Sequence, residues 1–207
     1  EIQPKTFIAE NVSGLVKGTA KGYFKEILRE LKECGYRVSA KLLNGAFLGV
    51  PQARERLIFV GIRNDLGLNP VFPTPFNYWY SIEDAWSGIK EHPEPETSIK
   101  GYSIEKLWHE TKLGKSHHKR FSLIRPNPRR PSPTIMATQG KGAAQVCHPL
   151  EPRTLSVAEV RRICSFPDDY VLTGKFEQKK ERMGRSVPPL MMKAIAEEIC
   201  NKILRKL

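Results

Sequence analysis

The stretch KTFIAENV, residues 5–12, decides the fold, because it is an apolar run that ends in polar residues and is typical of a buried strand. Residues 18–34 follow with Phe, Ile and Leu at helical spacing and end before a glycine, which predicts an amphipathic helix. Two further strand-like runs, residues 36–43 and 56–63, are joined by a turn-rich loop. We therefore expect residues 1–63 to have α/β structure.

The pattern changes over residues 64–150, where prolines interrupt short aromatic and basic segments, as in a loop-rich insertion or a small domain. A capping box at Ser156 and Glu159 then predicts a short helix through Cys164. The chain closes with a predicted helix over residues 189–204, which has proline in its first turn. The apolar face of this helix is expected to comprise Met191, Ile195, Ile199 and Ile203.

The composition favours a polyanionic partner. The 207 residues include 34 Lys and Arg against 22 Asp and Glu, a formal charge of +12, so nucleic acid is the first expectation and an anionic membrane surface the second. No apolar run long enough to span a bilayer and no leader sequence is visible, which predicts a soluble, cytoplasmic protein. The four cysteines show no CxxC pairing, and we predict neither a disulfide scaffold nor a metal site.

Two short motifs carry candidate chemistry in the first 63 residues. Glu10-Asn11-Val12 ends the first predicted strand, where open α/β sheets place ligands and a carboxylic acid could act on a base. A polar strand end without function is the other interpretation. Arg54 and Arg56 alternate in an extended segment, so both guanidiniums are expected on one side, facing the same carboxylate, phosphate or base oxygen. An edge strand protected by charge would look the same.

Two more motifs lie downstream. Residues 153–170 combine a capped helix with acidic and basic side chains that can pair, and structural support is the interpretation we prefer. Residues 184–189 are predicted to be a glycine turn that leads into the proline-started helix. Its backbone N–H groups could receive a ligand carboxylate or hydroxyl, although most such turns only begin a helix.

In order and spacing, these four segments resemble the signatures ENV, QxRxR, RxLxxxExxRxxxFP and GNxVPP of the cytosine-5 DNA methyltransferases, and the resemblance runs from Lys5 to Ile199. It implies part of a doubly wound, Rossmann-like methyltransferase sheet with a small irregular target-recognition domain. It further implies that residues 1–63 are part of the catalytic domain, residues 64–150 the recognition region, and residues 151–207 a return to the catalytic domain.

The resemblance also implies roles for single residues. Glu10 would hydrogen-bond N3 of a flipped-out cytosine and favour its protonation, Arg56 would hold the base O2, and Arg54 would support the site. Addition of a nucleophile to C6 pushes negative charge into the ring, so an acid and a cation at these atoms stabilise the transition state. The base must leave the duplex for this chemistry. The implied methyl donor is S-adenosylmethionine, with contacts from Asn11, Ser186 and Val187.

The chain departs from the family pattern in three ways. The family's nucleophile is the cysteine of a Pro-Cys dipeptide, but none of the four cysteines here follows a proline. The glycine-rich donor loop is also absent, and Arg185 stands where the family has Asn, which puts one cofactor-side hydrogen bond in doubt. The chain opens on Glu1 and reads like a fragment. We therefore expect no activity from it alone, with the missing parts upstream or on a separate polypeptide.

Basic residues cluster between positions 112 and 130, close in sequence to Trp108 and Phe121, and form the best candidate for a phosphate-binding site. A solvated basic loop would have the same sequence pattern. In residues 133–142, glycines allow close backbone approach and polar side chains could read a base edge. His117 and His118 have no partner at metal-ligand spacing and are expected on the surface. The predicted DNA-binding residues are Lys115, Lys119, Arg120, Arg129, Arg130, Thr138, Gln139 and Gly140.

The sequence thus predicts a DNA cytosine-5 methyltransferase, of restriction-modification type and bacterial or phage origin, with double-stranded DNA as its substrate. Two alternatives stay open: a non-catalytic DNA-binding subunit or remnant, and an RNA cytosine-5 methyltransferase of the same family.

Overall fold

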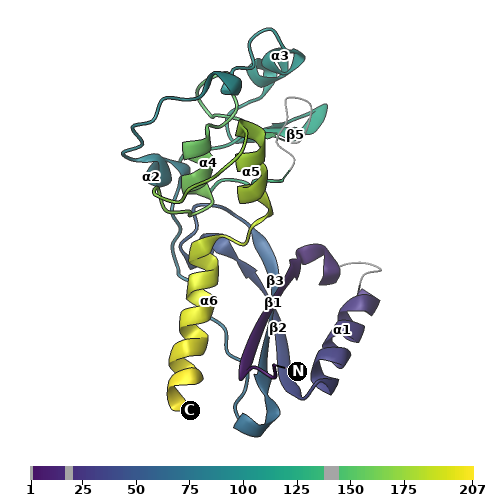
Figure 1. Cartoon of the computed structure of the whole chain (residues 1–207). Coiled ribbons are helices and arrows are strands. Elements are labelled where there is room, and N and C mark those ends of the chain that lie inside the picture. The colour runs from purple at the N-terminus through teal and green to yellow at the C-terminus, as the bar shows by residue number, and fades with distance from the viewer. Residues whose placement is uncertain (1, 17–20, 138–144) are drawn as a thin grey trace. The chain divides into compact units, whose positions relative to one another are not determined.

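The computed structural model describes residues 2–16, 21–137 and 145–207. Its contacts divide the chain into two compact units, whose elements are labelled in Figure 1. The first unit comprises residues 1–44, 55–75 and 192–207, and the second comprises residues 45–54 and 76–191. Among the described residues, no helix has the length and apolar character needed to cross a bilayer.

The first unit is built on a three-stranded antiparallel sheet in the order β1-β3-β2. The strands are β1 (Thr6–Val12), β2 (Tyr36–Asn44) and β3 (Glu55–Arg63). β3 is the central strand, and its residues 57–62 are all buried, because it has a strand on each edge and apolar side chains on both faces.

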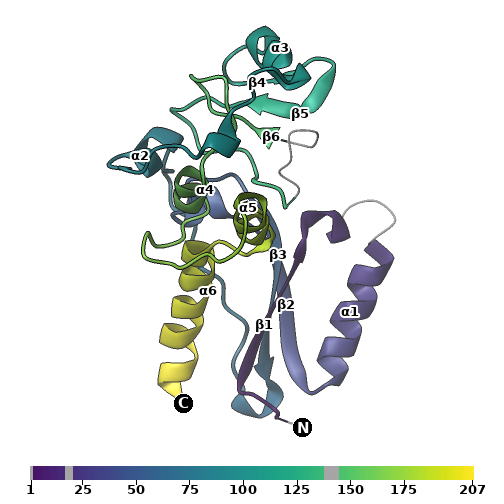
Figure 2. The same cartoon turned by 45° about the horizontal axis from the view of Figure 1, so that its top comes forward.

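One helix covers each face of this sheet, as Figures 1 and 2 both show. On one face, Leu57 and Phe59 of β3 pack against the apolar stripe of α1 (Lys21–Glu33). On the other side lies α6 (Pro189–Lys202), whose residues from position 192 onward belong to this unit. Ile195 and Ile199 on α6 are buried. The mixed α/β structure agrees with the predicted Rossmann-like methyltransferase fold, although the three strands of this unit are all antiparallel.

The second unit contains a small sheet in the order β4-β5-β6, with β4 and β5 antiparallel and β5 and β6 parallel. These strands are β4 (Lys115–His117), β5 (Arg120–Arg125) and β6 (Gln145–Val146). The helices are α2 (Ile82–Trp86), α3 (Ser103–Glu110), α4 (Val157–Ile163) and α5 (Phe176–Arg185). Helix α4 contacts both α2 and α5.

Paired charges fix the start of α4. Ser156 and Glu159 form the predicted capping box, in which the serine hydroxyl accepts the Glu159 N–H and the carboxylate accepts the Ser156 N–H. The Arg153 guanidinium donates to both oxygens of the buried Glu159 carboxylate, at 2.8 and 2.6 Å. The predicted structural pairing in residues 153–170 is therefore confirmed.

The strands and the closing helix lie where the sequence placed them, within one or two residues at most ends. All four residues of the predicted apolar face of α6, Met191, Ile195, Ile199 and Ile203, are buried. The compact units nevertheless differ from the predicted sequence ranges, because residues 151–191 group with the second unit rather than with residues 1–63.

The expectation of a glycine turn at Gly184 is wrong, since Gly184 lies in the last turn of α5. A β-carbon at this glycine would lie 2.3 Å from the Met136 carbonyl oxygen, so the residue is needed for close packing rather than for a turn. The surface placement of His117 is also wrong. This ring is buried, and its Nε2 lies 3.1 Å from Oε2 of Glu110 on α3.

Candidate active site

Glu10 and Arg56 come together on neighbouring strands of the first unit. Val12 of β1 lies directly opposite Arg56 of β3, and Glu10 precedes Val12 by two residues. Because side chains alternate along a strand, Glu10 and Arg56 project from the same face as a diagonal cross-strand pair. The pairing register of β1 and β3 therefore sets their separation.

The two side chains form a close ion pair. Arg56 Nε lies 2.5 Å from Glu10 Oε1, but the N–H bond does not point at that oxygen, so the contact is one of charge rather than an aligned hydrogen bond. Nη1 of Arg56 donates to the Glu55 carbonyl at 2.8 Å, which holds the guanidinium in place. The Arg56 side chain is 13% exposed and that of Glu10 is 30% exposed. The carboxylate therefore stays reachable by a ligand.

Arg54 has different partners. It is buried, and its Nη1 and Nη2 donate to the carbonyls of Ile135 at 2.8 Å and Gly184 at 2.7 Å. The expectation that the Arg54 and Arg56 guanidiniums face the same group is therefore wrong. The N–H of Arg54 donates to the Gln52 carbonyl two residues earlier, so the chain turns tightly before β3 begins and the strand alternation does not reach Arg54.

Gln52 is a residue of this motif whose role the sequence did not reveal. Its side chain is fully buried, accepts the Ile135 N–H at 3.1 Å, and approaches the Ile163 carbonyl and Cys164 Sγ at 3.4 Å each. Gln52 and Arg54 thus hold residues 45–54 within the second unit. The sequence did contain a signal for this role. Gln52 and Arg54 are polar residues at alternate positions directly before an apolar strand, and polar side chains that are buried next to such a strand must have hydrogen-bond partners.

The predicted cofactor residues lie in two places. Ser186 and Val187 line a cavity of about 360 Å³ in the second unit, together with the rings of Phe166 and Tyr170. The Ser186 hydroxyl donates to the Met183 carbonyl at 2.8 Å, so its lone pairs can still accept. Asn11 lies on β1 of the first unit, where its side-chain oxygen accepts the Val12 N–H at 2.8 Å.

The cysteines have environments that oppose a nucleophilic role for two of them. Burial raises the pKa of the Cys147 thiol to about 12 and that of the Cys164 thiol to about 11. A thiol with such a pKa holds almost no thiolate at neutral pH. Cys34 is exposed and Cys200 is intermediate in exposure.

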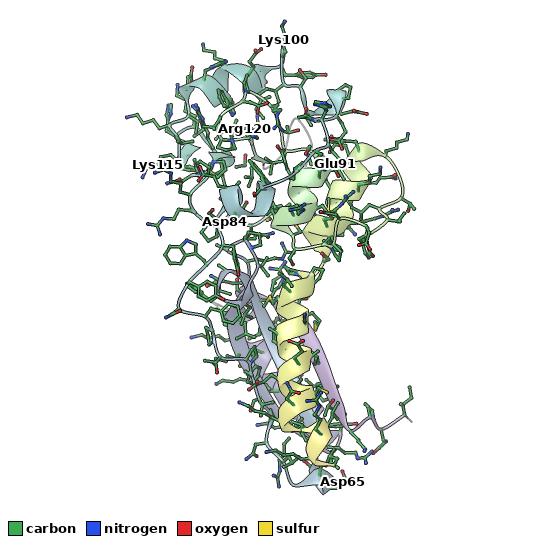
Figure 3. All side chains as sticks on the ribbon, turned by 90° about the vertical axis from the view of Figure 1, so that its left-hand side faces the viewer. Asp65, Asp84, Glu91, Lys100, Lys115 and Arg120 are labelled. Atoms are coloured by element: carbon green, nitrogen blue, oxygen red, sulfur yellow. The ribbon has the colours of Figure 1, made fainter. Side chains whose placement is uncertain are left out.

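The predicted phosphate-binding residues lie on the surface of the second unit. Lys115, Lys119, Arg129 and Arg130 are exposed, and Arg120 is partly exposed. Figure 3 shows Lys115 and Arg120 on one side of this unit. Thr138, Gln139 and Gly140 lie outside the described residues.

Two neighbours of this basic surface differ in character. Trp108 is buried, its Nε1 donates to the His148 carbonyl at 3.0 Å, and the Arg125 guanidinium lies 4.0 Å from the centre of its ring. Trp108 and Arg125 therefore stabilise the unit rather than face a ligand. Phe121 on β5, in contrast, is 78% exposed.

Comparison with known proteins gives the family. The profile of the C-5 cytosine-specific DNA methylases matches residues 1–201. The type II methyltransferase M.MthTI of Methanothermobacter thermautotrophicus is 33% identical, over all of this chain and 68% of that protein. M.PspPI of a Psychrobacter species is 29% identical, over 98% of this chain and 55% of that protein. The chain thus spans little more than half the length of several such relatives.

Solved structures agree in fold. A protein described as a DNA modification methyltransferase encoded within an E. coli prophage superposes with a TM-score of 0.76 at 20% identity, covering 97% of this chain and 70% of that one. The Entamoeba histolytica methyltransferase EhMeth superposes with a TM-score of 0.67 at 16% identity, covering 97% and 63% of the two chains. These likenesses establish the methyltransferase fold, and with the match over residues 1–201 they show that the chain belongs to the C-5 cytosine-specific DNA methylase family.

Proposed function

We propose that this chain provides the base-activating part of a DNA cytosine-5 methyltransferase of restriction-modification type, which methylates C5 of a flipped-out cytosine in a specific DNA sequence. The observation that carries the proposal is the Glu10–Arg56 pair, a reachable carboxylate held 2.5 Å from a permanent cation on the face of a sheet.

This pair suits the chemistry of cytosine. N3 and O2 are neighbouring atoms on one edge of the ring, and both gain negative charge when a nucleophile adds to C6. The protonated form of the Glu10 carboxyl can hydrogen-bond N3 and pass its proton there as charge develops, which leaves the carboxylate beside Arg56, and Arg56 at O2 can stabilise the oxygen. Arg56 also positions Glu10, since the ion pair fixes the carboxylate before the base arrives.

The chain offers one wall of a cofactor site. Aromatic faces of Phe166 and Tyr170 with the aliphatic Val187 suit an adenine ring, and the Ser186 hydroxyl can accept from an amino group, so these residues fit S-adenosylmethionine. When bound, that cofactor supplies an electrophilic methyl group. The role of Ser186 and Val187 is to bind and orient the cofactor, and we propose Asn11 as a further cofactor contact.

The nucleophile is proposed to come from a polypeptide segment that carries the family's Pro-Cys loop. None of the four cysteines follows a proline, and both buried thiols have strongly raised pKa values. We expect the chain to bind duplex DNA through Lys115, Lys119 and Arg120 without transferring a methyl group by itself. Adding a separately produced donor-binding polypeptide with the Pro-Cys loop should restore transfer if the chain is a subunit, and should not if it is a remnant.

The test is Glu10→Gln in the protein that contains this chain and the nucleophile. Transfer of tritium-labelled methyl groups to DNA should fall by about 10²–10⁴-fold, because the substitution removes the proton donor, while duplex affinity stays unchanged. The matched control is Glu55→Gln, which alters an exposed carboxylate next to Arg56 and leaves in place the Glu55 backbone carbonyl that accepts from the Arg56 guanidinium. Equal losses of methyl transfer and of DNA binding would contradict the assignment.

The RNA alternative shares every residue of this site. A competition binding experiment distinguishes the RNA alternative from the DNA substrate, because the narrow major groove of A-form RNA is inaccessible to a protein that reads duplex DNA there. If DNA is the substrate, unlabelled duplex DNA should displace a labelled DNA duplex from the protein, and structured RNA of equal length should do so far more weakly.

A further inference from the structure

An exposed aromatic surface lies in the second unit, away from Glu10 in sequence and not used by the proposed chemistry. The segment FNYWY, residues 76–80, has four rings that are each 40–48% exposed. Phe47 from the neighbouring loop adds a fifth ring at 36% exposure. Several large exposed aromatic side chains gathered in one short segment are unusual on a protein surface and make this segment a candidate interaction site. The aromatic platform comprises Phe47, Phe76, Tyr78, Trp79 and Tyr80.

The rings are ordered relative to one another. Phe76 and Tyr78 are stacked, with centroids 5.1 Å apart and planes 8° apart. Tyr80 lies next to Tyr78 with its centroid 5.8 Å away and its plane nearly perpendicular, at 87°. Alternate residues of an extended segment project to one side, which explains why these three rings are neighbours. Trp79 projects differently and contacts Phe47 edge to face at 6.4 Å.

Both ends of the segment are fixed. The Phe76 N–H donates to the Phe47 carbonyl at 2.8 Å. At the other end, Ser81 caps α2, and its N–H and hydroxyl both donate to the Asp84 carboxylate at 2.7 Å. The platform is therefore held in place before any ligand binds, which lowers the entropic cost of binding.

Basic side chains adjoin the platform. The Arg130 guanidinium lies 5.2 Å from the centre of the Trp79 ring, and Arg129 next to it is exposed. The Arg130 carbonyl accepts the Ile82 N–H at 3.0 Å, which ties the segment after β5 to the start of α2. Cationic groups and aromatic faces thus occur together in one unit.

We propose that the aromatic platform with Arg129 and Arg130 binds single-stranded DNA by stacking unpaired bases on its rings. Phosphates demand cations and unpaired bases demand flat apolar faces, and this surface offers both. Paired bases hide their faces within the stack, so a duplex cannot use the rings in this way. The inference goes beyond the proposed function and does not depend on methyl transfer.

The experiment measures binding of a fluorescein-labelled oligodeoxythymidine of about 16 nucleotides to the full chain by anisotropy. Trp79→Ala and Tyr78→Ala should each weaken binding by about tenfold, which is the contribution of one base stacked on an aromatic ring. An abasic oligomer with the same number of phosphates should bind more weakly to the unchanged chain and should not respond to these substitutions. Tyr23→Ala, which removes an exposed tyrosine of α1, is the matched control and should leave affinity unchanged.

The salt dependence of the affinity distinguishes the contribution of charge from that of ring stacking. Arg130→Gln should reduce the slope of log affinity against log salt by about 0.7, whereas the aromatic variants should lower affinity without changing the slope. Trp79→Phe keeps a ring and should retain most of the affinity. An unchanged circular dichroism spectrum and unfolding midpoint of Trp79→Ala would exclude misfolding as the cause of its loss.

Three results would overturn the inference: equal binding of the abasic and thymidine oligomers, unchanged affinity in both alanine variants, or an equal loss of duplex binding in those variants. A change in oligomeric state with single-strand affinity intact would likewise overturn it and assign the platform to a protein partner. If Glu10→Gln loses methyl transfer and DNA binding equally in the protein that contains the nucleophile, but the thymidine oligomer still binds through the rings, the inference stands and the proposed function fails.

Discussion

Gly184 of α5 lies against the backbone of Met136, so closely that a β-carbon at Gly184 would sit 2.3 Å from the Met136 carbonyl oxygen and 2.9 Å from the Ala137 nitrogen. The obstructing atoms are backbone and cannot move aside as a flexible side chain could. Gly184→Ala should therefore lower the free energy of unfolding by about 1–3 kcal/mol, measured by urea denaturation. Gly22→Ala in α1 is the control, because among the described residues no atom outside its own helix backbone and chain neighbours lies within 4 Å of the added methyl group. Alanine favours helix over glycine, so we expect Gly22→Ala to be neutral or stabilising by up to about 1 kcal/mol. Matching losses in the two variants would contradict the packing role of Gly184.

Arg54 joins two distant carbonyls with one rigid guanidinium. In Arg54→Lys a single ammonium cannot reproduce both hydrogen bonds, and one buried carbonyl loses its donor, which costs about 1–3 kcal/mol in the free energy of unfolding. Arg37→Lys is the control, since its exposed guanidinium donates to the Gly67 carbonyl at the surface, and this substitution should change stability by less than about 0.5 kcal/mol. Equal stability of the two variants would show that the Arg54 bonds are not needed.

His148 should make the protein less stable in mild acid. Its ring stacks on Trp86, and its Nδ1 accepts the N–H groups of Leu150 and Glu151, so protonation at Nδ1 would break both hydrogen bonds. Burial, followed by the charge of Arg153, lowers the His148 pKa below its ordinary value of 6.5.

The unfolded chain therefore binds the proton more readily than the folded one, and the stability that His148 contributes is present above pH 6.5 and lost as the pH falls below it. The free energy of unfolding, followed from pH 7.5 down to about pH 5, should decline in this window. His148→Phe should be less stable at neutral pH and have a flatter profile, whereas His92→Gln, which alters an exposed histidine, should follow the unchanged protein. A profile that is the same with and without His148 would exclude it as the titrating group.

The four cysteines should differ in reactivity. Burial raises the pKa of Cys147 to about 12 and that of Cys164 to about 11, so both thiols should resist alkylation in the folded protein at pH 8. Cys34 is exposed and should react first. Iodoacetamide labelling followed by peptide mass spectrometry tests this order, with a urea-unfolded sample as the control in which all four thiols react. Early labelling of Cys147 or Cys164 in the folded protein would contradict their burial.

The sequence predicted the first unit well, because its strands are apolar runs and its helices have apolar residues at helical spacing, patterns that depend on local burial alone. It failed at Arg54, where the expected alternation requires a regular strand but the chain makes a tight turn at Ala53 before β3 begins. The pairing of Glu10 with Arg56 also depends on the register of two strands that are 46 positions apart, a long-range property that the residues alone do not reveal.

Helix α5 was missed for a related reason. Gly184 and the following polar residues are typical of a turn, and only the packing of Gly184 against Met136 explains why a glycine is tolerated inside a helix. His117 was placed wrongly because its partner Glu110 comes from a separate helix. In each case the deciding contact lies outside the local pattern.

The two carbonyl partners of Arg54 have a consequence for biosynthesis. Ile135 follows Arg54 by 81 residues and Gly184 follows it by 130. A ribosome that adds about 5–20 residues per second delivers Gly184 roughly ten seconds after Arg54. During that interval the Arg54 guanidinium lacks one of its two acceptors, so the packing around residues 45–54 stays incomplete until α5, the last helix of the second unit, has been translated.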